Sequence, residues 1–515
     1  MHIFTLLFYK QNKYTNMNKT NYNLNPNTLV SYLEKEPQYF TKQDLITFIV
    51  DHHIKMVNFH YLADDGHLKT LNFVINSMDH LNQLLSSGER VDGSSLFSHI
   101  QAGESDLYVI PRYRTAFVNP FLETPSLDLL CTFFTKYGTP LESGPDYILH
   151  KANVALQEET ALEFHTMGEL EYYIISDKDE LFPAEDQKGY QESFPFNKME
   201  NFRTEAMKLI SQCGGQIKYG HSEVGNFVMG DKNYEQNEIE FLPCPVEEAA
   251  DQLTIAKWIL RQLAYLYEVS ITFAPKITTG KAGSGLHIHT RLVKDGKNVM
   301  VENGKLSDTA KKAIAGYLKL APSLTAFGNT NPTSYFRLVP HQEAPTSICW
   351  GDRNRSVLVR VPLGWTGSSD MAQIINPLEE IQNTDFSYKQ TVEYRAADGS
   401  ANVYHLMAGL TAAALHGLTM DKALEYAKET YVDINIFDNE AVSNKLKTLP
   451  ESCVQSAKAL NTQKTEFLKH NIFTEDLLDN IIENLTAFDD ENLREEVSKN
   501  EQKLIDLVNA NINCG

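Results

Sequence analysis

The sequence predicts an α+β protein with at least two domains, and three observations lead to this prediction. The chain has 515 residues, which is long for one hydrophobic core. Its hydrophobic content of 42% and aromatic content of 10% are those of an ordinary folded protein. Segments with the apolar pattern of strands are interspersed with segments that have helical spacing. This mixture is typical of the α+β class.

The first part of the chain divides into an extension and a small domain. Residues 1–28 include an Asn- and Lys-rich stretch, and we expect them to form a disordered N-terminal extension. Over residues 29–137, apolar segments such as 57–62 and 71–74 predict the strands of a small α+β domain. Gly and Pro residues in 138–145 interrupt both helix and strand, and they predict a linker.

The larger part, residues 138–515, is expected to form a second domain. Strands are predicted at 169–175, 286–292 and 357–361. A helix is predicted near 401–418, where Ala and Leu dominate. Beyond residue 440 the chain is charged with apolar residues at helical spacing, as in 476–482, and this pattern predicts a helical C-terminal region.

Charge and cysteine content indicate the setting in which the protein works. The formal net charge of −21 disfavours a nucleic-acid partner, because phosphate binding needs clustered Lys and Arg. Six scattered cysteines without a C-x-x-C pair favour a reducing compartment. The apolar run 3–9 is far shorter than the ~20 residues that span a bilayer. We therefore expect a cytoplasmic protein with no membrane or nucleic-acid partner.

Two pairs of side chains at positions i and i+2 are candidates for a metal site. Glu169 and Glu171 would share one face of a strand, and so would His287 and His289. Carboxylates this close repel one another unless a cation lies between them or one is protonated. The alternatives are a solvent-exposed strand face for the glutamates and a structural role for the histidines. Neither pair is decisive alone.

Three further glutamates, Glu223, Glu238 and Glu393, extend this candidate site. Each could be an ordinary surface residue. A site with several carboxylates and an imidazole suits Mg²⁺ or Mn²⁺ better than zinc, with water and phosphate oxygens at the open positions.

Arginines in apolar surroundings are the second half of the pattern. They are Arg337, Arg355, Arg360 and Arg395. Buried arginine is costly without a partner, and its planar fork suits phosphate and carboxylate groups. The alternative is internal pairing with the glutamates. Glutamates for a metal together with arginines for anions indicate phosphoryl transfer.

Taken in order, these motifs resemble the glutamine synthetase family, in particular its long bacterial type. Nine blocks agree in sequence and order, from Val91-Asp92-Gly93-Ser94-Ser95 to Val392-Glu393-Tyr394-Arg395. The other blocks lie at 168–171, 221–224, 236–238, 273–276 with 283–289, 331–340, 343–345 and 353–356. The resemblance implies a β-grasp-like N-terminal domain and a catalytic domain with a curved antiparallel sheet and helices.

The resemblance also implies roles for individual residues. Glu171, Glu223 and Glu238 would hold one divalent cation, and Glu169, His287 and Glu393 a second. His289 and Arg355 would contact nucleotide or phosphate, and Arg360 would stabilise the transferred phosphoryl group. Arg337, Arg395 and Gly283 would bind glutamate. Asp92, donated by a neighbouring subunit, would form an ammonium pocket with Glu343, and Ser95 would be a substrate-binding residue. Asp92 would deprotonate ammonium, and Glu343 would shield the intermediate.

The implied activity is ATP-dependent ligation of ammonium to the γ-carboxylate of glutamate through γ-glutamyl phosphate, with two or more Mg²⁺ or Mn²⁺ ions in each site. The implied assembly is a homo-oligomer, a dodecamer of two stacked hexameric rings with active sites between subunits.

This chain departs from the family pattern at four places. Ala282 stands where Asn is usual, residues 227–234 resemble an insertion, His341 and Gln342 alter the segment before Glu343, and Tyr190 does not align cleanly with a tyrosine of the ammonium pocket. Two alternatives to ammonium ligation therefore stay open. One is a γ-glutamyl ligase that uses a larger amine, and the other is a non-catalytic homologue.

Overall fold

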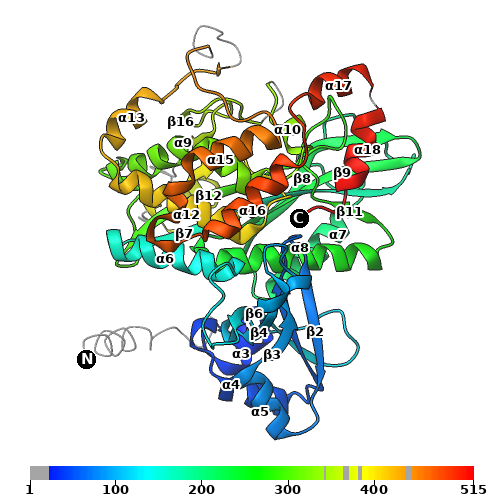
Figure 1. The fold of residues 1–515 in the computed structure, drawn as a ribbon. Coiled ribbons are helices and arrows are strands. Elements are labelled where there is room, and N and C mark those ends of the chain that lie inside the picture. The colour runs from blue at the N-terminus through cyan, green and yellow to red at the C-terminus, as the bar shows by residue number, and fades with distance from the viewer. Residues whose placement is uncertain (1–21, 341–343, 363–370, 381–385, 437–443, 501) are drawn as a thin grey trace.

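The computed structural model describes residues 22–340, 344–362, 371–380, 386–436, 444–500 and 502–515 (Figure 1). Two sheets organise these residues, one in the small N-terminal part and one in the large part above it in the view. Helices accompany both sheets, so the α+β class is confirmed. Among the described residues, no helix is both long and apolar enough to cross a membrane.

The N-terminal sheet has the strand order β2-β1-β6-β4-β3, and β5 pairs with β6. Its strands are β1 (Met56–Leu62), β2 (Leu68–Val74), β3 (Glu89–Asp92), β4 (Asp106–Pro111), β5 (Phe117–Val118) and β6 (Ser126–Thr135). The predicted strands at 57–62 and 71–74 are confirmed as parts of β1 and β2. β1 and β6 run parallel in the middle of the sheet, and the other pairs are antiparallel.

Among the residues that the structure describes, the α-helices that accompany this sheet are α3 (Thr28–Leu33), α4 (Lys42–Asp51) and α5 (Met78–Ser87). Leu45, Phe48 and Leu84 on the helices join a core with Phe59 and Leu129 on the strands.

The expectation of disorder for 1–28 needs one correction. Residues 1–21 lie outside the described part, but residues 22–28 lead directly into α3. The buried Asn27 side chain accepts a hydrogen bond from the Leu29 amide at 2.9 Å, which caps the helix.

The larger sheet has the order β16-β17-β18-β12-β7-β9-β8, with the short strands β10, β11 and β13 at its margins. Its strands are β7 (Glu163–Asp177), β8 (Ile217–Met229), β9 (Lys232–Phe241), β10 (Cys244–Pro245), β11 (Ser270–Thr272), β12 (Leu286–Lys294), β13 (Lys297–Asn298), β16 (Trp350–Asp352), β17 (Val359–Val361) and β18 (Val392–Tyr394). β14 (Val301–Glu302) and β15 (Lys305–Leu306) form a separate hairpin.

The implied antiparallel sheet is a mixed one, because β16 and β17 run parallel while the other described pairs are antiparallel. The strands predicted at 169–175 and 286–292 lie within β7 and β12, whereas the one predicted at 357–361 is shorter and begins at Val359.

Long helices pack on this sheet and on one another. They are α6 (Pro145–Thr160), α7 (Glu200–Gln212), α8 (Val246–Leu266), α9 (Asp308–Gly328) and α12 (Val403–Thr419). The predicted Ala-rich helix at 401–418 is confirmed as α12, which Asn402 caps and which is buried on nearly all sides. Shorter helices are α10 (Ser334–Arg337), α11 (Met371–Ile375) and α13 (Ala423–Glu429).

The predicted helical C-terminal region is present as four helices, α15 (Cys453–Leu468), α16 (Glu475–Thr486), α17 (Leu493–Lys499) and α18 (Gln502–Asn511). In Figure 1, α17 and α18 lie beside α10 and the β8–β9 hairpin. Leu504 and Val508 of α18 share a small core with Phe336 of α10.

Candidate active site

Strand pairing brings the predicted metal ligands to one face of the larger sheet. Glu169 on β7 lies opposite His287 on β12, and Glu171 lies opposite Glu238 on β9. His289 on β12 lies opposite Glu393 on β18. Residues that face each other across a strand pair project to the same side of the sheet, and so do residues two apart on one strand. The i and i+2 argument from the sequence therefore operates across four adjacent strands.

These side chains open into one cavity of about 490 Å³. Its lining residues are Glu169, Glu171, Tyr190, Lys218, Tyr219, His221, Glu223, Val224, Glu238, Glu240, His287, His289, Arg355, Arg360, Pro362, Glu393 and Arg395. All six predicted metal ligands belong to this lining. The alternative of a solvent-exposed strand face does not apply to Glu169 and Glu171, because they line a polar cavity and their side chains are only 13% and 10% exposed.

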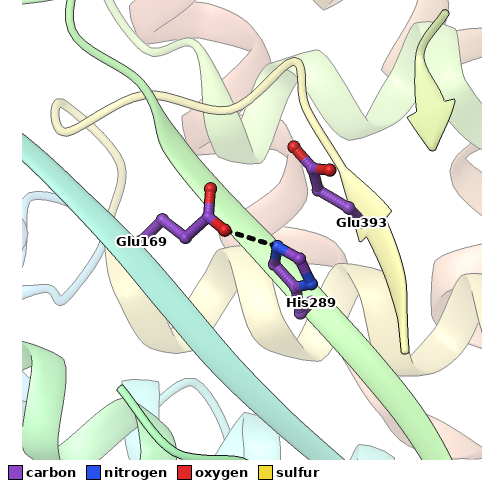
Figure 2. Close-up of side chains that lie close together, drawn as sticks. All are labelled: Glu169, His289 and Glu393. Atoms are coloured by element: carbon purple, nitrogen blue, oxygen red, sulfur yellow. Dashed lines mark hydrogen bonds and ion pairs between the residues drawn. The ribbon is translucent and has the colours of Figure 1, made fainter. Parts of the chain in front are cut away.

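One group of ligand atoms consists of Glu169, His289 and Glu393, whose nearest donor atoms all lie within 4.8 Å of one another (Figure 2). His289 Nε2 lies 2.7 Å from Glu169 Oε1, and His287 Nδ1 lies 3.0 Å from Glu169 Oε2. Glu393 projects from β18 into the same space as Glu169 and His289. The Glu169 carboxylate is thus shared between two imidazoles.

Two further groups lie beside the first one. His221, Glu223 and Glu238 form one, and Glu169, Glu238 and Glu240 form the other. Glu223 reaches the cavity where β8 is irregular, because its register against β9 shifts between Ser222 and Asn226. Glu238 belongs to both groups and is only 5% exposed.

The pKa values of the glutamates diverge strongly within this cavity. Burial raises the pKa of Glu238 well above its usual range, and the neighbouring charges of Glu169 and Glu171 raise it further. Burial would also raise the pKa of Glu169, but the His289 and His287 imidazoles outweigh it and hold that pKa well below the usual range. The Arg395 guanidinium likewise overcomes burial and lowers the pKa of Glu393. Uncompensated negative charge is therefore concentrated around Glu238.

Two of the predicted arginines pair with Glu393 and also line the cavity. Arg360 Nη1 donates to Glu393 Oε2 at 2.9 Å, and Arg395 Nε donates to Glu393 Oε1 at 3.0 Å. The internal pairing that the sequence left open as an alternative is thus present for these two arginines. Arg355 lines the cavity as well.

Arg337 takes a different position, because it is 4% exposed and is not among the lining residues of the described cavity. Its Nη1 donates to the Ala396 carbonyl at 2.8 Å, and its Nη2 lies 3.2 Å from His287 Nε2. Arg337 thus forms the wall behind a predicted metal ligand.

Gly283 lies beside Arg337 and, among the described residues, is likewise outside the cavity lining. A Cβ there would come within 2.5 Å of the Pro275 carbonyl oxygen and 2.9 Å of Arg337 Cγ. Only glycine fits that close approach.

Asp92 and Ser95 lie on the N-terminal domain, and in the described part of the chain they are not among the residues that line this cavity. Ser95 Oγ donates to Asp92 Oδ2 at 2.6 Å, and Ser94 Oγ donates to Asp92 Oδ1 at 2.7 Å. These two hydroxyl groups lower the pKa of the exposed Asp92. Glu343, together with the altered residues His341 and Gln342, lies outside the described residues.

Sequence reasoning missed four polar members of the site, namely Lys218, Tyr219, His221 and Glu240. The period-two rule would have found two of them, because His221 precedes Glu223 and Glu240 follows Glu238 by two residues. Glu240 accepts hydrogen bonds from Lys218 Nζ and Tyr219 Oη. Burial and the charge of Glu169 raise its pKa.

The departures from the family pattern have visible consequences. Residues 227–234 form the end of the β8–β9 hairpin, where the rings of Phe227 and Tyr234 stack with centroids 4.8 Å apart. Further along β9, Glu238 pairs with Glu171 on β7. Ala282 has its backbone fixed, because its carbonyl accepts from Tyr173 Oη at 2.8 Å. Tyr190 lines the cavity beside His221.

The donor set fits hard divalent cations. Six carboxylates line the cavity, none of its lining residues is a cysteine, and the close groups combine carboxylates with at most one imidazole each. Oxygen-rich sets of this kind suit Mg²⁺ or Mn²⁺, and a cation would offset the charge concentrated around Glu238.

Comparison with known proteins agrees with this architecture. The glutamine synthetase catalytic domain matches residues 142–505, and the glutamine synthetase β-grasp domain matches residues 53–136. The β-grasp-like N-terminal domain is thereby confirmed. The boundary after residue 137 stays a prediction.

Individual relatives cover most of the chain. The glutamine synthetase of Thermococcus kodakarensis is 31% identical over 395 residues, which are 75% of this chain and 80% of the relative. That of Clostridium saccharobutylicum is 29% identical over 81% of this chain and 88% of the relative.

Two solved structures share the fold. Apo GmaS has a TM-score of 0.71 at 19% identity over 87% of this chain and 95% of its own. Plasmodium falciparum glutamine synthetase has a TM-score of 0.71 at 18% identity over 90% of this chain and 97% of its own. With both of its domains matched, the chain belongs to the glutamine synthetase family.

Proposed function

We propose that the protein ligates ammonium to the γ-carboxylate of L-glutamate in an ATP-dependent reaction that passes through γ-glutamyl phosphate and yields glutamine, ADP and phosphate. The observation that carries this proposal is the convergence of all six predicted metal ligands and three of the predicted arginines on one cavity. Like charges held this close together are energetically unfavourable, and a non-catalytic homologue would gain nothing by keeping them.

The metal ligands divide into two sets in this proposal. Glu171, Glu223 and Glu238 would hold one Mg²⁺ or Mn²⁺ ion. Glu169, His287 and Glu393 would hold the other. Bound there, the ions would supply positive charge to the phosphate oxygens and to the developing negative charge of the transition state.

Phosphoryl transfer depends on neutralising charge as it moves from ATP to the γ-carboxylate. Arg360 is anchored on Glu393, which presents a fixed cation at the cavity wall. Arg355 and His289 line the same cavity and would contact the nucleotide or its phosphates. A positive charge that is already oriented costs no reorganisation when the reaction occurs.

Glutamate would be held through Arg395 and Arg337, with Gly283 giving backbone contacts. Arg337 lies behind His287. In this role, the glutamate carboxylate would therefore have to pass His287 to contact the Arg337 guanidinium. Ammonium would bind near Asp92, Ser95 and Glu343. Asp92 has a lowered pKa, which keeps its carboxylate ionised for the binding of ammonium, and it would accept the proton. Glu343 would shield the acyl phosphate from water.

Asp92 lies on the N-terminal domain, outside the described lining of this chain's own cavity, which supports a site completed by a second subunit. We therefore propose a homo-oligomer, with two stacked hexameric rings as the expected arrangement. The cytoplasmic location expected from the sequence stays a prediction.

The test is the reaction itself. Purified protein supplied with glutamate, ATP, Mg²⁺ and ammonium should form glutamine and release phosphate in equal amounts, and omission of any one component should stop both. Failure with both Mg²⁺ and Mn²⁺ would overturn the proposal.

A γ-glutamyl ligase for a larger amine is the second candidate. Ala282 replaces a side chain usual at the glutamate loop, and one of the similar structures is that of GmaS. Rates with ammonium, polyamines and arylamines at equal concentration would separate the two. Equal or better use of a bulky amine would replace the first candidate by the second.

A further inference from the structure

The helix that carries Arg337 is too short to be stable on its own. α10 spans only Ser334–Arg337. An isolated turn of this length is marginal, and its last carbonyl groups have no partner within the helix. After α10 the Val339 amide donates to the Arg337 carbonyl rather than to that of Tyr335. The orientation of α10 must therefore come from its surroundings.

Arg494 of α17 supplies the missing hydrogen bonds. Its Nη2 donates to the Tyr335 carbonyl at 2.7 Å and to the Leu338 carbonyl at 3.1 Å. One guanidinium nitrogen thus holds carbonyl groups on both sides of Arg337. Its Nη1 also lies 3.4 Å from a carboxylate oxygen of Glu451.

The same C-terminal helices hold α10 through an apolar contact. Phe336 shares a small buried core with Val497 of α17 and with Leu504 and Val508 of α18. This contact lies one residue from Arg337 in the chain. α17 and α18 thus fix α10 both by hydrogen bonds and by packing.

Arg337 itself has little room to move. Its guanidinium donates to the carbonyls of Ala396 and Ala397 and lies 3.2 Å from His287 Nε2. A Cβ on Gly285 would come within 2.5 Å of Arg337 Nη2, which shows how closely backbone and side chain approach there. A small shift of α10 would therefore be transmitted to Arg337 and to His287.

We propose that Arg494 is a positioning residue for the substrate-binding arginine Arg337, and that α17 and α18 act as a brace behind the glutamate end of the active site. This inference rests on the proposed function, in which Arg337 binds a glutamate carboxylate. Arg494 acts through α10 and does not touch the substrate.

Replacing Arg494 should therefore weaken glutamate binding selectively. Removal of a hydrogen-bond donor that carries charge costs about tenfold or more in an equilibrium. R494A is expected to raise the KM for glutamate about tenfold while the KM for ATP stays within about twofold. R494K keeps one donor nitrogen and should give an intermediate KM. The matched control is K499A, because Lys499 lies on the same helix and pairs with the exposed Glu495.

Hydrogen exchange of the peptide 331–340 provides a readout that needs no activity. Exchange should be about tenfold faster in R494A and unchanged in K499A. If the wild type is active, the positioning role would be overturned by an R494A variant whose KM for glutamate is unchanged, or whose KM values for glutamate and ATP are raised together. If the wild type is inactive, the proposed function is refuted instead. Unchanged hydrogen exchange of 331–340 in R494A would then separately refute the support of α10 by α17 and α18.

Discussion

Substitution of Glu238 by Gln is a sharp test of the metal site. It should weaken the binding of divalent ions, but it should not destabilise the protein when these ions are absent. Glu238 is 5% exposed and belongs to two of the three close ligand groups. Burial raises the pKa of Glu238, and repulsion from the charges of Glu169, Glu171 and Glu223 raises it further. The E238Q variant keeps the shape of the side chain and removes one negative charge.

The magnitude follows from the role assigned to Glu238. Mutation of residues that only orient a metal ligand costs roughly 10- to 100-fold in metal affinity, so loss of a charged ligand should cost at least about 100-fold, or about 2.8 kcal/mol. In chelator-treated protein the same change relieves repulsion, so the free energy of unfolding should stay equal or rise. General damage to the fold would lower both quantities.

Titration calorimetry with Mn²⁺ on chelator-treated protein measures the affinity, and denaturant unfolding measures the stability. E235Q is the matched control, since Glu235 is a buried carboxylate on the same strand but accepts hydrogen bonds from the Lys198 and Met199 amides. It should lose stability and keep its Mn²⁺ affinity. An E238Q variant that binds Mn²⁺ with wild-type affinity and stoichiometry would show that Glu238 is not a metal ligand.

Three further predictions follow. Because the pKa of Glu238 is raised in the folded state, the stability of chelated protein should fall as pH rises from about 4.5 through that raised pKa, by up to about 1.4 kcal/mol per pH unit, and unfolding curves at several pH values would detect this. R112A removes a guanidinium 2.8 Å from Asp251 at the contact between the domains, and it should lower the free energy of unfolding by about 3 kcal/mol in denaturant titrations. Inactive D92N and E393Q proteins, dissociated and reassembled as an equal mixture, should recover about a quarter of wild-type activity if each site uses two subunits, and a mixture without recovery would contradict the shared site.

That the candidate metal ligands share one face of the sheet could be predicted because strand geometry is regular. Once Glu169 and Glu171 lie on one strand, and His287 and His289 on another, the period of two determines which side chains share a face. The same rule should have been applied to Glu240 and His221. The family resemblance assigns a role to neither residue, although His221 belongs to the block at 221–224 that carries part of that resemblance.

Other features depend on contacts that a sequence pattern does not encode. The parallel pairing of β16 with β17 follows from the path of the chain between them, and short strands carry little directional signal. Arg337 shares its apolar setting with Arg360, yet only Arg360 reaches the cavity lining. Asn27 caps α3, but it stands in a polar stretch whose composition resembles that of a disordered segment.

Diffraction data collected at a wavelength that reveals Mn²⁺, from crystals grown with Mn²⁺ and ADP, would locate the metal ions in the cavity. We expect one ion bound by Glu171, Glu223 and Glu238 and another bound by Glu169, His287 and Glu393. Ions bound elsewhere, with these six side chains making no metal contacts, would contradict this expectation.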